Sequence, residues 1–74
     1  FATVPLAFMK ELSIPREKVN ILGGAIALGH PLGNSGSRIV CTLLTAMKKR
    51  KAKYGIAAIC NGGGGGSAML ISNL

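Results

Sequence analysis

The sequence contains few of the residues on which metal binding, disulfide scaffolds and aromatic recognition depend. Its 74 residues include no tryptophan, one tyrosine, two phenylalanines, one histidine, two cysteines and two acidic residues. A metal site needs more cysteine, histidine or carboxylate ligands than this set supplies, so we expect no metal. Two cysteines allow at most one disulfide, which is far from the framework of a small disulfide-rich domain.

Negative charge is nearly absent, since Glu11 and Glu17 face nine lysines and arginines and the net charge is +7. Five of the cations fall within residues 48–53. Such a run could attract nucleic acid, anionic lipid or a phosphorylated ligand. No aromatic residues are interleaved for base stacking, and cations favour the C-terminal end of a helix. We therefore interpret residues 48–53 as a solvated helix end and expect no nucleic-acid partner, an interpretation that salt-dependent DNA binding would reverse.

Length limits what the chain can do by itself. Seventy-four residues suffice for at most one small domain, and no apolar stretch is long enough to span a membrane. The sequence opens at Phe1 without an initiator methionine or a targeting segment. We expect these residues to be a piece of a larger protein.

Hydrophobic periodicity predicts an α/β arrangement. Residues 1–12 have an apolar repeat typical of a helix, in which Pro5 is tolerable only near the first turn. Residues 13–17 break this pattern as a loop, residues 19–22 are a short strand candidate, and the glycine-rich residues 23–36 predict a long shaped loop without regular structure.

The second half of the pattern is a helix followed by two strands. A helix from residue 35 or 36 to about residue 49 is apolar over most of its circumference, which predicts a buried helix with Cys41 in the core. Residues 55–59 and 67–71 read as two antiparallel strands of a hairpin.

The two glycine-rich stretches carry the residues suited to chemistry. His30 lies between Gly29 and Pro31, and Cys60 follows the first predicted strand and precedes five glycines at residues 62–66. Backbone without side chains can approach a ligand closely, and its amides can stabilise an oxyanion. A fixed imidazole and a thiol can each move protons, so we interpret both as catalytic rather than structural residues. The glycine run lacks the Lys-Ser/Thr pair of a phosphate-binding loop and precedes a strand instead of a helix.

These stretches closely resemble the two C-terminal signatures of the thiolase family. The residues concerned are Gly23–Arg38 (GGAIALGHPLGNSGSR) and Cys60–Gly65 (CNGGGG), and Phe1-Ala2 is similar to the end of the family's Asn-Glu-Ala-Phe motif. The resemblance covers nearly all of residues 1–74, in the correct order and spacing. It implies a segment from the C-terminal half of a layered α/β/α fold, with a buried helix packed on a mixed sheet that ends in a β-hairpin. The form of the second signature is most similar to acetoacetyl-CoA thiolases.

The resemblance also implies a thioester Claisen condensation or its reverse. A cysteine of the N-terminal half of a thiolase takes up an acyl group from acyl-CoA. The residue that matches His30 activates this cysteine and contacts the thioester oxygen. The residue that matches Cys60 acts as a general acid and base. The backbone amide that matches Gly62 donates a hydrogen bond to the oxyanion. We expect the neighbouring residues Gly29, Asn61 and Gly63 to contact the substrate.

Further expectations follow from the family. We expect coenzyme A thioesters as substrates, without another cofactor. We expect the full protein to be a homodimer or homotetramer. We expect an intracellular location, mitochondrial or cytosolic rather than peroxisomal. The family's nucleophile has no counterpart here, because Cys41 matches a core position, so residues 1–74 alone should not turn over. The alternatives are a 3-ketoacyl-CoA thiolase for longer chains and a non-catalytic thiolase-like protein; the presence of both His30 and Cys60 disfavours the latter.

Overall fold

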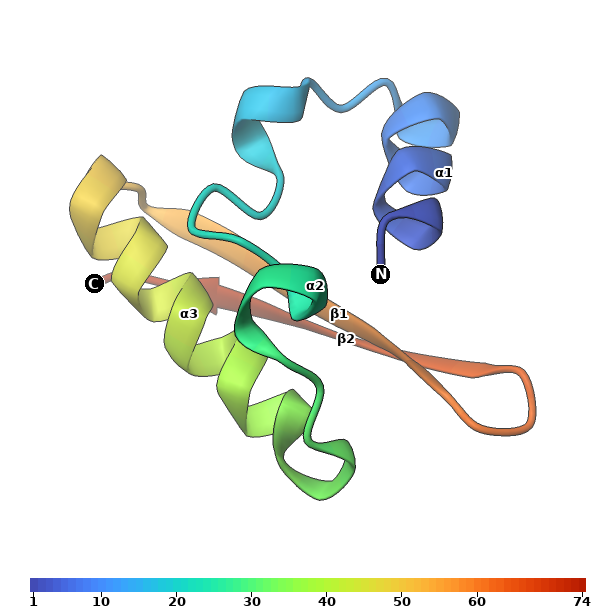
Figure 1. Ribbon diagram of the computed structural model, residues 1–74. Helices are drawn as coiled ribbons and strands as arrows, with labels where there is room; N and C mark the ends of the chain where they lie inside the picture. The colour runs from blue at the N-terminus through green and yellow to red at the C-terminus, as the bar shows by residue number, and fades with distance from the viewer. The chain divides into compact units, whose positions relative to one another are not determined.

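The computed structural model describes all of residues 1–74 and consists of two compact units, residues 1–31 and residues 32–74. Figure 1 shows the order of elements: helices α1 and α2 in the first unit, and helix α3 followed by strands β1 and β2 in the second. None of these helices is both long and apolar enough to cross a membrane. The α/β class expected from the sequence is confirmed.

Helix α1 (Thr3–Leu12) confirms the first predicted helix. Pro5 is its third residue, where no intrahelical partner exists for a backbone N–H, so the missing donor costs nothing. The helix ends at Ser13, whose φ of 53° is left-handed. The Ile14 N–H then donates to the Met9 carbonyl at 3.0 Å, which satisfies one of the last helical acceptors.

Residues 19–22 are not a strand, contrary to the prediction. A 3-10 turn, η1 (Arg16–Lys18), precedes them, and Asn20 adopts a positive φ of 46°. The Gly23 N–H donates to the Asn20 carbonyl at 2.9 Å, which closes a turn where an extended chain was expected. Asparagine tolerates left-handed backbone better than other non-glycine residues, and here that tolerance outweighs the strand preference of the apolar residues around it.

The glycine-rich residues 23–36 also contain more regular structure than predicted. They include the one-turn helix α2 (Ala25–Leu28) and the 3-10 turn η2 (Leu32–Asn34), and the following helix already starts at Ser35. The glycines lie mostly at the ends of these short turns, where they change the chain direction without interrupting the helical hydrogen bonds.

Helix α3 (Ser35–Arg50) and the hairpin of β1 (Tyr54–Asn61) and β2 (Gly65–Ser72) confirm the predicted helix and strands. The two strands pair antiparallel in a two-stranded sheet, with Tyr54 opposite Ser72 and Asn61 opposite Gly65. The sequence analysis expected a mixed sheet. Within residues 1–74 the sheet has a single pair of strands, and this pair is antiparallel.

Helix α3 packs against β1 at a point where the strand has no side chain. A Cβ on Gly55 would lie 2.6 Å from Met47 Sδ and 2.8 Å from Leu43 Cδ1, so both side chains occupy the space that glycine leaves. Met47 and Ala57 are buried, with 5% and 8% of their surface exposed. These residues form the core of the second unit.

Cys41 is exposed, so its predicted place in the core is wrong for this chain. It precedes Met47 by six residues, which places it about 120° around the helix from the side that packs on β1. The apolar circumference of α3 is therefore only partly covered within residues 32–74.

The basic run lies at the C-terminal end of α3, in agreement with its interpretation as an exposed helix end. Lys48, Lys49 and Arg50 form the last turn and are exposed, and Lys51 ends the helix with a φ of 53°. The Ala52 N–H donates to the Met47 carbonyl at 2.9 Å. Cations at this end interact favourably with the negative end of the helix dipole.

Candidate functional site

His30 directly follows a helical turn that ends at a glycine. The Gly29 N–H donates to the Ala25 carbonyl at 2.8 Å, which closes α2. Gly29 has φ 93° and ψ 166°, a region of backbone space that is essentially restricted to glycine. The chain therefore leaves α2 in a direction that a residue with a side chain would not take, and His30 is exposed just after this bend.

The ring of Phe1 lies against the imidazole of His30. Their centroids are 5.6 Å apart and the ring planes meet at 84°, which is an edge-to-face arrangement. Sequence reasoning assigned Phe1 to the end of a motif and gave it no contact with His30. The two residues are 29 positions apart in the sequence, and nothing in periodicity or composition links them.

The first unit also contains a cavity of about 220 Å³. Its lining residues come from segment 1–9, η1 and segment 19–26, and include Phe1 and Arg16. Arg16 Nη1 donates to the Val19 carbonyl at 2.8 Å, so this guanidinium is engaged by the backbone beside it.

Cys60 lies near the end of β1, opposite a residue without a side chain. The strand register places Gly66 across from Cys60 and Gly65 across from Asn61. The Cys60 thiol is free and exposed. Its cross-strand neighbour is glycine, and a Cβ at Gly66 would meet no atom within 4 Å, so the space across from Cys60 is open.

Cys60 and Asn61 project to opposite faces of the hairpin, although they are adjacent in sequence. Side chains alternate along a strand, so Asn61 shares the face of Gly55 and Ala57, against which α3 packs, and Cys60 is on the other face. Asn61 Nδ2 donates to Ser67 Oγ at 3.0 Å, so its amide links the two strands. The predicted contact of Asn61 with substrate stays a prediction beside this observed structural bond.

The predicted oxyanion donor belongs to the hairpin loop. Gly62, Gly63 and Gly64 connect β1 to β2, and the last two have φ of 84° and 88°. The structure thus brings Cys60, Gly62 and Gly63 together in one turn, and Gly29 and His30 together in another. The two groups belong to different compact units, and the predicted proximity of His30 to Cys60 stays a prediction.

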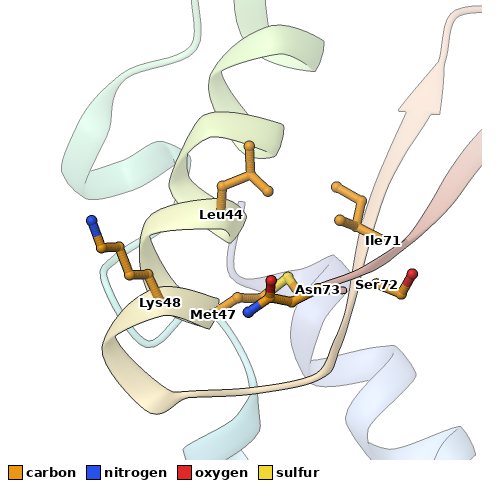
Figure 2. Close-up of a pocket in the computed structure, with 6 residues that line it drawn as sticks. All are labelled: Leu44, Met47, Lys48, Ile71, Ser72 and Asn73. Carbon is orange, nitrogen blue, oxygen red and sulfur yellow. The ribbon is translucent and has the colours of Figure 1, made fainter.

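The second unit contains a cavity whose lining includes none of the predicted site residues. Figure 2 shows its lining residues, of which Leu44, Met47 and Lys48 come from α3 and Ile71, Ser72 and Asn73 come from the end of the chain. Its volume is about 360 Å³. Its lining consists of three apolar residues, one lysine and two small polar side chains, and it includes no histidine, cysteine or carboxylate.

The described side chains include no group of three metal-ligand residues placed close enough to hold a metal ion. The predicted site residues supply an imidazole, a thiol and glycine amides. These groups are suited to proton transfer and to the stabilisation of an oxyanion in acyl transfer.

Comparison with known proteins identifies the family. Residues 1–73 match the family described as "Thiolase, C-terminal domain". A cytosolic acetyl-CoA acetyltransferase of Gibberella zeae is 58% identical over all 74 residues, which correspond to 19% of its length. Acetyl-CoA acetyltransferase 2 of Arabidopsis thaliana is also 58% identical over the whole chain, at 18% of its length. An acetyl-CoA acetyltransferase of Schizosaccharomyces pombe is 51% identical, at 19% of its length.

The chain belongs to the thiolase family and matches its C-terminal domain. It spans less than a fifth of the length of the relatives named above. The resemblance seen in the two glycine-rich stretches is thereby confirmed at the level of the family.

Proposed function

We propose that the protein containing residues 1–74 is an acetyl-CoA acetyltransferase, and that these residues are a C-terminal segment of it. The reaction joins two acetyl-CoA molecules into acetoacetyl-CoA and free CoA, or runs in reverse as thiolysis. The observation that carries the proposal is the identity of 51–58% along the entire chain to proteins named for this activity. The segment supplies His30 and Cys60 to the reaction.

In the first half-reaction, a cysteine outside residues 1–74 acts as the nucleophile. His30 accepts the proton of that thiol, and the thiolate attacks the thioester carbonyl of acetyl-CoA. The bond from the carbonyl carbon to the CoA sulfur breaks, the acetyl group stays on the enzyme, and the CoA thiolate takes up a proton. The Gly62 N–H donates to the oxyanion, and we assign substrate contacts to Gly29 and Gly63.

In the second half-reaction, Cys60 removes a proton from the α-carbon of another acetyl-CoA. The resulting carbanion attacks the acetyl-enzyme carbonyl, so that a carbon–carbon bond forms and the bond to the enzyme sulfur breaks. The released thiolate is reprotonated, and the thiolysis direction reverses each of these steps. Cys60 thus acts as a base in one direction and as an acid in the other.

The surroundings of Cys60 support this role. The thiol is exposed and faces away from α3, and the residue across from it is glycine. The position of β2 directly across from the sulfur therefore leaves room for a thioester. Coenzyme A thioesters are the proposed substrates, and no further cofactor is part of the mechanism.

The test uses the complete protein with single substitutions. Cys60→Ala and His30→Ala should each reduce acetoacetyl-CoA thiolysis by at least about a hundredfold, because a positioned proton-transfer group contributes about 10²–10⁴. Cys41→Ala is the matched control, since Cys41 is the other free and exposed cysteine and should keep its activity. Wild-type rates in Cys60→Ala or His30→Ala would exclude that residue from the mechanism.

The same assay decides between the proposed substrate and longer ones. A rate for acetoacetyl-CoA well above that for longer 3-ketoacyl-CoA supports an acetyl-CoA acetyltransferase, and the reverse order indicates a thiolase of broader chain length. If the complete wild-type protein turns over neither substrate, the protein is a non-catalytic member of the family. Light scattering on the same preparation measures the proposed homodimer or homotetramer.

A further inference from the structure

We propose that Phe1 is a positioning residue for His30. In this proposal the phenyl ring restricts the imidazole to the orientation in which it accepts the proton of the nucleophile. The inference deepens the proposed function, since it rests on His30 acting in the first half-reaction. Phe1 itself takes no part in bond making or proton transfer.

The geometry of the two rings carries the proposal. A centroid distance of 5.6 Å lies within the range of about 4.5–7 Å over which aromatic rings attract each other, and an angle of 84° is the preferred edge-to-face arrangement. Rotation of the imidazole out of this arrangement gives up the contact. The Phe1 ring therefore favours a subset of the side-chain conformations of His30.

The backbone around His30 explains why such a restraint is useful. Gly29 sets the chain direction through its φ of 93°, and Pro31 restricts the backbone of His30 from the other side. Gly29 has no side chain, and Pro31 belongs to no helix or strand. The backbone sets the position of the His30 Cα atom, and the Phe1 ring sets the orientation of the imidazole nitrogens.

Phe1 is itself held by the beginning of helix α1. The Ala2 carbonyl, next to it, accepts the Leu6 N–H at 3.1 Å in the first helical turn. Phe1 also lines the cavity of about 220 Å³ in the first unit. Phe1 thus lies two residues before the ten-residue helix α1 and directly precedes its N-cap residue, Ala2.

An ordinary packing role predicts a different ranking of the two phenylalanines. Phe1 is 65% exposed, whereas Phe8 of α1 is partly buried. Loss of the Phe8 ring should therefore destabilise the protein more than loss of the Phe1 ring, because the free energy lost increases with the buried apolar area. If Phe1 positions His30, the ranking for activity is the opposite.

The experiment compares Phe1→Leu, Phe1→Met, Phe1→Tyr and Phe8→Leu in the complete protein. We measure the melting temperature, kcat and KM for acetoacetyl-CoA thiolysis, and the single-turnover rate of CoA release from acetyl-CoA. Phe1→Leu and Phe1→Met should lower kcat and the CoA-release rate by about ten- to hundredfold, as expected for a displaced catalytic group, with KM within about twofold. Phe1→Tyr keeps the ring and should restore both rates. Phe8→Leu should lower the melting temperature and leave both rates unchanged.

Two results would overturn the proposal. One is wild-type kcat and CoA release in both Phe1→Leu and Phe1→Met, and the other is an equal loss of rate in Phe1→Tyr and Phe1→Leu. His30→Ala, measured in parallel, separates this proposal from the proposed function. If His30→Ala is inactive and the Phe1 variants are not, only the positioning role fails; if His30→Ala is fully active, the assignment of His30 fails first.

Discussion

The glycine-rich stretches around His30 and Cys60 have similar compositions but place their glycines differently. Before His30, Gly24 and Gly29 flank the single turn of α2, and the bend at Gly29 directs the histidine. After Cys60, Gly63 and Gly64 form a turn with two successive positive φ values, and Gly66 lies across from the thiol. In the first stretch glycine directs the chain, and in the second it also keeps a surface free of side chains. The following predictions test this distinction in the complete protein, from the largest to the smallest expected effect on stability.

Gly29→Ala should have the largest effect, because its conformation is essentially closed to residues with a side chain. We expect a loss of about 1–3 kcal/mol in the free energy of unfolding, measured by chemical denaturation. The activity should fall as well, since any relaxation of the bend moves His30. Gly33→Ala is the control: a Cβ there meets no atom within 4 Å, and φ is not positive. Equal losses in the two variants would contradict the special role of the bend.

Gly55→Ala tests a glycine that is required by space and not by its backbone conformation. Its Cβ would overlap with Met47 and Leu43, so α3 must shift or the two side chains must leave their positions. Overpacking of this kind costs about 1–3 kcal/mol, which thermal denaturation can detect. Gly36→Ala, near the start of α3, is the control and should be neutral or stabilising, because its Cβ has open space. A neutral Gly55→Ala would show that the helix does not pack on β1 as described.

The sequence was sufficient to predict the elements with strong periodicity. Helix α3 starts at the predicted residue, and β1 and β2 are each longer than predicted but pair as a hairpin. The helix and the hairpin depend on local patterns of apolar residues, which a single sequence is enough to show. The same reasoning failed for residues 19–22, because the positive φ of Asn20 depends on a turn that no periodicity marks.

The sequence allows a prediction of the site residues, which stays a prediction, but it does not reveal their neighbours. Glycine-rich stretches single out His30 and Cys60, and only the strand register shows that the residue facing Cys60 lacks a side chain. The Phe1–His30 contact and the Asn61–Ser67 hydrogen bond were not predicted. The first joins positions distant in sequence, and the second depends on the pairing register of two strands, which glycine-rich segments specify weakly.

Gly64→Ala should have a smaller effect than Gly29→Ala. Its φ of 88° is unfavourable for alanine, but no atom lies within 4 Å of the added Cβ. The expected loss is about 1–2 kcal/mol, which follows from the cost of left-handed backbone for a residue with a side chain. Gly64→Asn should lose less than Gly64→Ala, because asparagine tolerates this region better. If Asn and Ala destabilise equally in chemical denaturation, the loss does not originate in the backbone conformation.

Gly66→Ala should change stability least and still change activity, which makes it the sharpest test of the open surface beside Cys60. Alanine in a strand is favoured over glycine by about 0.5–1 kcal/mol, and the new Cβ meets nothing within 4 Å, so the melting temperature should stay or rise slightly. The methyl group would lie on the same face of the hairpin as the thiol and occupy part of the space that the thioester needs. We therefore expect KM to rise by about tenfold. Gly65→Ala is the matched control, because its Cβ would lie 3.3 Å from Asn61 Nδ2 on the opposite face. It should disturb the Asn61–Ser67 hydrogen bond, and with it stability. Because we also predict a substrate contact for Asn61, KM should rise in Gly65→Ala, but by less than in Gly66→Ala. If the two variants change KM equally, the thiol does not face the open side of the hairpin, and the route assigned to the substrate is wrong.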